Sequence, residues 1–101
     1  MTEVVYADDA QADLDQLFAD IADRAGQSIA RSWLERIRTS CDGLAQFPER
    51  GSPQVHIRPG LRIIGFRRRA TIAYLVVGDR VVILRVLARG RSLEKAFGGE
   101  S

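Results

Sequence analysis

Three consecutive arginines, Arg67, Arg68 and Arg69, are the residues of this sequence best suited to contact an anion. A guanidinium presents a fork of N–H donors that matches the oxygens of a phosphate or a carboxylate. Arginine supplies fourteen of the fifteen basic side chains, although a bias toward arginine codons would explain that excess equally well. Charged runs of this kind are also often simply solvated. We predict that the three arginines form an exposed positive turn that attracts phosphate or carboxylate groups.

The other reactive side chains do not indicate a catalytic or metal centre. His56 is the only histidine, and it lies in a proline- and glycine-rich loop where no partner residue is expected. Cys41 falls on the apolar stripe of a predicted helix, so we expect a buried and inert thiol. Asp13, Asp20 and Asp23 lie on another predicted helix with no histidine near them, and we expect a solvated face. We therefore predict no metal site and no cofactor.

Charge is strongly polarised along the chain. The formal net charge is only +2, but residues 1–50 hold ten acidic and five basic side chains, whereas residues 51–101 hold three acidic and ten basic ones. A basic half favours an acidic partner, which could be a protein or a nucleic acid.

The length of 101 residues predicts a single domain over residues 1–101. A single cysteine excludes an internal disulfide. The N-terminus lacks the basic start and apolar stretch of a signal peptide, and no apolar run approaches the roughly 20 residues that span a bilayer. We therefore expect a cytoplasmic protein that does not enter the membrane.

A β-hairpin over residues 70–88 is the element around which the chain is organised. Two apolar runs, Ala70–Val77 and Arg80–Ala88, flank Gly78 and Asp79. Glycine followed by aspartate suits a type II′ turn, because glycine takes the positive φ of the first position without strain. This turn predicts the register of the two strands.

In that register Tyr74 lies opposite Ile83, Ile72 opposite Arg85, and Val76 opposite Val81, all on one face. The other face is apolar too, so each face of the hairpin needs a cover. The chain itself can supply one cover, and we expect a partner to supply the other. An outer face with ordinary exposed apolar area is the alternative.

The remaining elements follow from apolar periodicity and from breaker residues. We expect a strand at Glu3–Tyr6, a helix over 10–25 capped by Asp8 or Asp9 and ended by Gly26, a helix over 27–47, a loop over 48–60, a strand over 61–66 and a short helix over 92–97. The two long helices form an antiparallel αα-hairpin. The predicted fold is therefore α+β, with the helical pair on one face of an antiparallel sheet and the first strand at an edge.

Five short motifs along the chain together indicate a resemblance to a known family. In order along the chain they are Ala10-x-x-Asp13-Leu14-x-x-Leu17, Leu44-x-x-Phe47-Pro48-Glu49-Arg50-Gly51, Pro59-Gly60-Leu61-Arg62, Ile72-x-Tyr74 and Val82-Ile83-Leu84-Arg85-Val86-Leu87. Each is weak alone, but together, in this order and spacing, the chain resembles a RelE/ParE-family toxin over nearly its whole length. The likeness is closer to the ParE branch.

This resemblance implies the toxin of a bacterial type II toxin-antitoxin system, neutralised by a ParD-like antitoxin. ParE-branch toxins poison DNA gyrase, whereas RelE-branch toxins cleave messenger RNA on the ribosome. No specific DNA binding by the toxin alone is expected. A member that has lost toxicity and acts only as a binding module is a further alternative.

The residue types at the expected nuclease positions favour gyrase inhibition over RNA cleavage. RNA cleavage needs a proton acceptor, a proton donor and charge stabilisers around one phosphate. Many relatives have a histidine directly after the Arg-Val-Leu strand, but this chain has Ala88 there, and a guanidinium does not ordinarily give up a proton. We therefore predict no catalytic residue. The alternative nuclease set is Arg62, Tyr74, Arg85 and Arg91.

The resemblance also assigns two contact surfaces as predictions. For the antitoxin, the expected contacts on the outer face of the hairpin are Tyr74, Val81, Ile83, Arg85 and Leu87. For the target or another anion, the expected contacts are Arg62, Arg67, Arg68, Arg69, Arg89 and Arg91.

Overall fold

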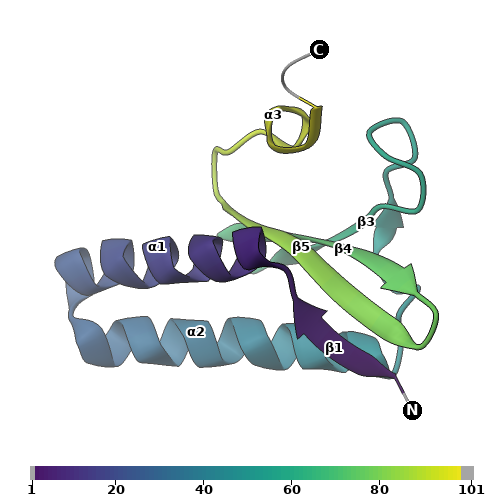
Figure 1. Cartoon of the computed structure of the whole chain (residues 1–101). Helices are drawn as coiled ribbons and strands as arrows, with labels where there is room; N and C mark the ends of the chain where they lie inside the picture. The colour runs from purple at the N-terminus through teal and green to yellow at the C-terminus, as the bar shows by residue number, and fades with distance from the viewer. Residues whose placement is uncertain (1, 99–101) are drawn as a thin grey trace.

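The computed structural model describes residues 2–98, which form a sheet and three helices (Figure 1). The elements in chain order are β1 (Glu3–Tyr6), α1 (Asp8–Ala25), α2 (Gln27–Asp42), a 3-10 turn (Gly43–Ala45), β2 (Ser52–Pro53), β3 (Arg62–Phe66), β4 (Ala70–Val77), β5 (Arg80–Ala88) and α3 (Leu93–Gly98). The strand order across the sheet is β1-β5-β4-β3-β2. This α+β architecture is the one that the sequence predicts.

The sheet is mixed rather than antiparallel. β1 lies at one edge, as predicted, but it pairs with β5 in parallel. The other three strand pairs, β5 with β4, β4 with β3 and β3 with β2, are antiparallel. The two-residue β2 at the opposite edge was not predicted, because Ser52–Pro53 has no apolar pattern to indicate a strand.

The helix ends agree with the sequence in part. Gly26, with φ of 95°, ends α1 as expected for a residue in the left-handed region. The predicted cap by Asp8 or Asp9 is wrong, because Ala7 is the N-cap and no side chain caps the helix. Asp8 and Asp9 lie inside the first turn, where the helix dipole favours negative charge. α2 also stops earlier than predicted, at Asp42, before the weak helix former Gly43.

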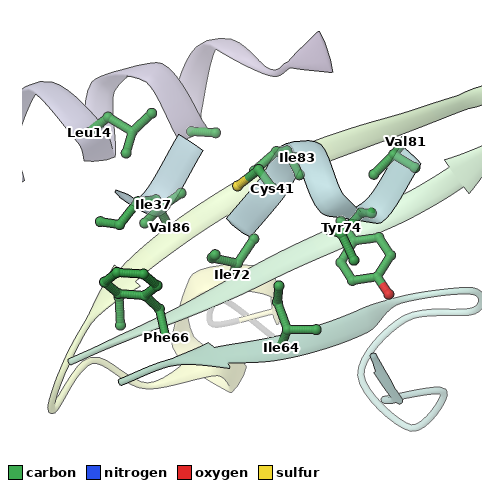
Figure 2. Packing of buried hydrophobic residues seen from close by; sticks show 13 residues of the cluster. Leu14, Ile37, Cys41, Ile64, Phe66, Ile72, Tyr74, Val81, Ile83 and Val86 are labelled. Carbon is green, nitrogen blue, oxygen red and sulfur yellow. The ribbon is translucent and has the colours of Figure 1, made fainter. Parts of the chain in front are cut away.

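The core lies between the helical pair and one face of the sheet (Figure 2). The main cluster of buried residues draws on both helices, the 3-10 turn and three strands: Ala10, Leu14, Ile37, Cys41, Leu44, Ile64, Phe66, Ala70, Ile72, Tyr74, Val81, Ile83 and Val86. Its buried members on the helices come from the first half of α1 and the second half of α2.

The β4–β5 hairpin confirms the predicted turn and half of the predicted register. Gly78 has φ of 60°, and Tyr74 pairs with Ile83 as expected. Beyond that pair a bulge shifts the register by one residue, so Arg85 pairs with Ala73 instead of Ile72. The predicted pairs on that side of the bulge are therefore wrong.

The predicted placement of the antitoxin contacts on an outer face is also wrong. Tyr74, Val81 and Ile83 are 0% exposed, because they point into the core beneath the helices. Leu87 lies outside this cluster but is only 2% exposed. These four side chains offer no accessible surface to a partner.

Within the described residues, none of the helices is long and apolar enough to cross a membrane.

Candidate functional site

Tyr74 and Arg62 hold the loop over residues 48–51 against the sheet. The Tyr74 hydroxyl donates to the Pro48 carbonyl over 2.8 Å and accepts from the Gly51 N–H over 2.9 Å. Arg62 Nη1 donates to the carbonyls of Glu49 and Gly51, at 3.0 and 2.7 Å. Arg62 and Tyr74 are partners in the β3–β4 register, so one site on the sheet anchors the whole loop. The hydrogen-bonding groups of both residues thus serve the fold.

Arg85 forms an ion pair with Asp13 of α1. Arg85 Nε and Nη2 donate to the two carboxylate oxygens at 2.8 and 2.9 Å, and the Val86 N–H donates to Asp13 Oδ2 at 2.8 Å. The two side chains are 18% and 11% exposed. Hydrogen bonding to Asp13 raises the pKa of Arg85 above its usual value. Arg85 was predicted to face an antitoxin, but this pair ties it to α1.

Asp13 itself was predicted to be solvated, and that prediction is wrong. The signal was present in the sequence, since Asp13 lies three residues after Ala10 and four before Leu17. This spacing places Asp13 on the apolar stripe of α1.

Five arginines gather at the end of the sheet where β3 turns into β4 and where β5 ends. We call this set the arginine end, and its members are Arg67, Arg68, Arg69, Arg89 and Arg91. A hydrogen bond of 2.8 Å from the Arg89 N–H to the Arg69 carbonyl joins its two segments. All five residues are exposed, and within residues 2–98 none forms a salt bridge. Arg62, predicted to belong with them, lies elsewhere on the sheet.

The turn within the arginine end has an unusual backbone. Arg67 and Arg68 have φ of 52° and 59°, and the Arg69 N–H closes the turn on the Phe66 carbonyl over 2.8 Å. Non-glycine residues in this region are strained. The Arg67 guanidinium lies 5.8 Å from the centre of the Phe66 ring, and that of Arg69 lies 5.6 Å from the centre of the Trp33 ring. Two cations are thereby held over aromatic faces.

The predicted alternative nuclease set is not assembled around a free centre. Arg91 and Arg85 line one shallow hollow beside α3, but Arg62 and Tyr74 lie at the 48–51 loop. The Tyr74 hydroxyl is buried and bonded on both sides, so it cannot reach a substrate proton. His56 is exposed in the loop before β3, whereas the arginine turn follows β3 at its other end. Among the described residues of this set, Arg91 is exposed and able to contact an anion, whereas Arg62, Tyr74 and Arg85 are bonded to other parts of the chain.

Cys41 is buried, as predicted. Burial raises the pKa of the Cys41 thiol to about 11, and burial also raises the pKa of the Tyr6 phenol beside it. A protonated, enclosed thiol is a poor nucleophile. No cluster of three or more His, Cys, Asp or Glu suited to a metal ion occurs in the part of the chain that the structure describes.

A cleft with both apolar and charged lining residues, between the helical pair and the sheet, was not predicted from the sequence. It has a volume of about 730 Å³ and lies between the far ends of α1 and α2 and the arginine end of the sheet. Its apolar lining includes Leu17, Ile21, Ile29, Trp33 and Phe66. The apolar periodicity of the two helices includes Leu17, Ile21, Ile29 and Trp33, but it could not show how these side chains lie relative to the sheet.

Comparison with known proteins identifies the family to which this chain belongs. The model of the family described as "ParE toxin of type II toxin-antitoxin system, parDE" matches residues 4–93. Toxin ParE3 of Caulobacter vibrioides is 32% identical over 98 residues, which are 97% of this chain and 97% of that protein. Toxin ParE1 of the same bacterium is 29% identical over 92 residues, with 88% of this chain and 91% of that protein covered.

A solved structure described as "Chromosomal ParDE TA system from P. aeruginosa" has the same fold. It aligns with a TM-score of 0.78 at 23% identity, over 88% of this chain and 97% of that one. The chain therefore belongs to the ParE toxin family of type II toxin-antitoxin systems.

Proposed function

We propose that this protein is a toxin of the bacterial cytoplasm that inhibits DNA gyrase by binding to it, and that a ParD-like antitoxin neutralises it. Membership of the ParE family supports the toxin role. The antitoxin partner is suggested by the similar P. aeruginosa structure, which is of a ParDE system. The target is suggested by the ParE resemblance of the sequence.

The arginine end is the observation that supports inhibition without catalysis. Five exposed guanidinium groups can bind carboxylates or phosphates of a target, and none of them can act as a proton shuttle. Tyr74, the tyrosine of the alternative nuclease set, is enclosed by its own hydrogen bonds. A surface of this kind is suited to recognition by charge.

A supercoiling assay with purified chain and gyrase tests the proposal. We expect inhibition and accumulation of cleaved DNA complexes. Replacing Arg67, Arg68 and Arg69 together by alanine should weaken inhibition several-fold, because it removes three exposed cations of the arginine end. Circular dichroism checks that the fold is retained, since Arg67 and Arg69 also contact the Phe66 and Trp33 rings. Arg31 and Arg36, exposed on α2, provide the matched control, and their replacement by alanine should leave inhibition unchanged.

Primer extension on translated messages, during induction of the chain, examines the RelE-type alternative. Cuts at fixed codon positions together with unaffected gyrase would contradict the proposal. Normal growth of cells that accumulate folded chain without antitoxin would contradict the toxin role itself and would favour a binding module.

A further inference from the structure

The turn between β3 and β4 keeps arginine where the backbone disfavours it. Arg67 and Arg68 both have positive φ, at 52° and 59°, which is the pattern of the two central residues in a type I′ hairpin turn. Asparagine and glycine are favoured there because they reach the left-handed region at low cost. Departures from such local preferences are concentrated at functional sites. The backbone of this turn thus points to a use for its charged side chains outside the fold.

Two further arginines reach this turn from the end of β5. The Arg89 N–H donates to the Arg69 carbonyl over 2.8 Å, and Arg91 follows two residues later, where it lines a shallow hollow with Lys95. All five arginines are exposed, and within residues 2–98 none forms a salt bridge. Asp20 lines the cleft beside Arg69 and Arg89 but is not paired with either. The charge of the arginine end is therefore available to a ligand.

The aromatic rings beside the arginine end are engaged by the chain itself. Phe66 is only 7% exposed, and the Arg67 guanidinium lies 5.8 Å from its ring centre. Trp33 packs edge-on against Phe66 and has the Arg69 guanidinium 5.6 Å from its own ring centre. Proteins that bind single-stranded nucleic acid use open aromatic faces on which the bases stack. The arginine end is therefore better suited to phosphates than to unpaired bases.

The density of positive charge matches a DNA duplex better than an acidic protein surface. The Cα atoms of Arg67 and Arg69 lie at most about 7.6 Å apart. A DNA duplex carries one charge per roughly 1.7 Å of its axis, which is about four charges over that length. A protein partner would need as many carboxylates gathered on one surface, where they repel one another. Guanidinium forks also bind phosphate oxygens through two N–H groups at once.

We propose that the arginine end binds the phosphate backbone of duplex DNA, so that the toxin binds gyrase together with the DNA that the enzyme holds. The inference rests on the proposed function, because it takes gyrase as the target. Contacts to phosphates carry no information about base sequence, so no sequence preference is expected. This agrees with the expectation that the toxin alone binds no specific DNA site.

Fluorescence anisotropy with a labelled DNA duplex about two helical turns long, titrated with the purified full chain, tests the contact. The logarithm of the binding constant should fall with the logarithm of NaCl concentration by about 0.9 for each phosphate contacted. Three to five contacts therefore predict a slope of about −3 to −4.5. A duplex of unrelated sequence should bind within about twofold of the first.

Arg68→Asn with Arg89→Gln removes two of the five charges. We expect binding about tenfold weaker or more at low salt, and a slope that is less steep by about 1.8. Asparagine tolerates the left-handed region, so the turn should be retained. Arg31→Gln with Arg36→Gln, on the exposed side of α2, removes the same charge and should leave binding within about twofold. Circular dichroism of each variant checks the fold.

Binding to gyrase with and without DNA separates a DNA contact from a contact with the enzyme. Wild-type chain should bind the gyrase–DNA complex more tightly than gyrase alone. Arg68→Asn with Arg89→Gln should abolish this difference and keep the affinity for gyrase alone. If this variant loses affinity for gyrase alone to the same extent, the arginine end contacts an acidic protein surface, and the inference is overturned.

The outcomes also separate the DNA contact from the proposed function. If wild-type chain inhibits gyrase but binds the duplex no better than Arg68→Asn with Arg89→Gln does, the DNA contact is overturned while the function stands. If a single-stranded RNA of the same length binds more tightly than the duplex and is lost in this variant, the inference is overturned as well. If wild-type chain does not inhibit gyrase, the proposed function fails, and the duplex titration still decides whether the arginine end binds DNA.

Discussion

Replacing Tyr74 by phenylalanine removes one oxygen atom and leaves two backbone groups of the 48–51 loop without their partner. The Gly51 N–H, on a buried residue, loses its 2.9 Å acceptor, and the Pro48 carbonyl loses its 2.8 Å donor. An unsatisfied buried donor costs about 1 to 3 kcal/mol, whereas the partly exposed carbonyl can turn to water. We expect the free energy of unfolding to fall by about 2 kcal/mol, which corresponds to a Tm roughly 10 °C lower.

Tyr6→Phe is the matched control for this substitution. Tyr6 Oη is buried and, among the described residues, has no hydrogen-bond partner, although the weakly bonding Cys41 thiol lies beside it. Its removal should change stability by less than about 0.5 kcal/mol. Urea unfolding measures both variants, and we expect a midpoint about 1 M lower for Tyr74→Phe alone. Equal midpoints for the two variants would refute the view that Tyr74 anchors the loop.

Three further predictions concern other parts of the fold. Gly51→Ala should lower the free energy of unfolding by more than about 2 kcal/mol, because the new Cβ would lie 2.6 Å from Tyr74 Oη and 2.7 Å from the Ile63 carbonyl oxygen. A Cβ at Gly65 meets nothing within 4 Å, so Gly65→Ala, the control, should cost less than about 1 kcal/mol. Urea unfolding measures both variants. Asp13→Asn should lower the free energy of unfolding by about 2 kcal/mol, because it leaves the partly buried Arg85 guanidinium without its counter-charge. Glu3→Gln should lower it by at most about 0.5 kcal/mol, because the side chains of the Arg80–Glu3 pair are 60% and 62% exposed. Equal losses in thermal melts would count against a stabilising role of the Asp13–Arg85 pair. Burial raises the pKa of the Cys41 thiol to about 11 from the ordinary 9.0, so the folded state holds this proton more tightly than the unfolded state, and the free energy of unfolding should fall as pH rises from 9.0 toward 11. Ellman's reagent should modify this thiol quickly only in denaturant. Rapid labelling of native protein at pH 8 would contradict the burial of Cys41.

The elements set by local chemistry could be predicted from the sequence. The Gly78 turn, the strands on both sides of it and the end of α1 at Gly26 follow from turn and cap residues alone. The register of β4 with β5 could be predicted only as far as Ile83. Beyond that residue the Val86 N–H bonds Asp13, a residue 73 positions away, and no local pattern reveals such a contact.

The site was predicted less well, for two physical reasons. Both faces of the hairpin are apolar, so the pattern does not reveal which face the helices cover, and Tyr74 was placed on the wrong one. The Tyr74 hydroxyl is satisfied by the backbone of a distant loop, which only the folded chain shows. The sequence grouped all five members of the arginine end but wrongly included Arg62, whose guanidinium bonds the backbone of the 48–51 loop instead.

The most direct test of inhibition by binding is a titration of gyrase supercoiling with the purified chain at several incubation times. A toxin that acts by occupying gyrase should inhibit in proportion to its concentration, saturate once gyrase is fully bound, and show the same midpoint at every incubation time. Addition of a ParD-like antitoxin should reverse the effect. Undiminished supercoiling with the chain in large excess, accompanied by cleavage of translated messages that grows with time, would contradict the account.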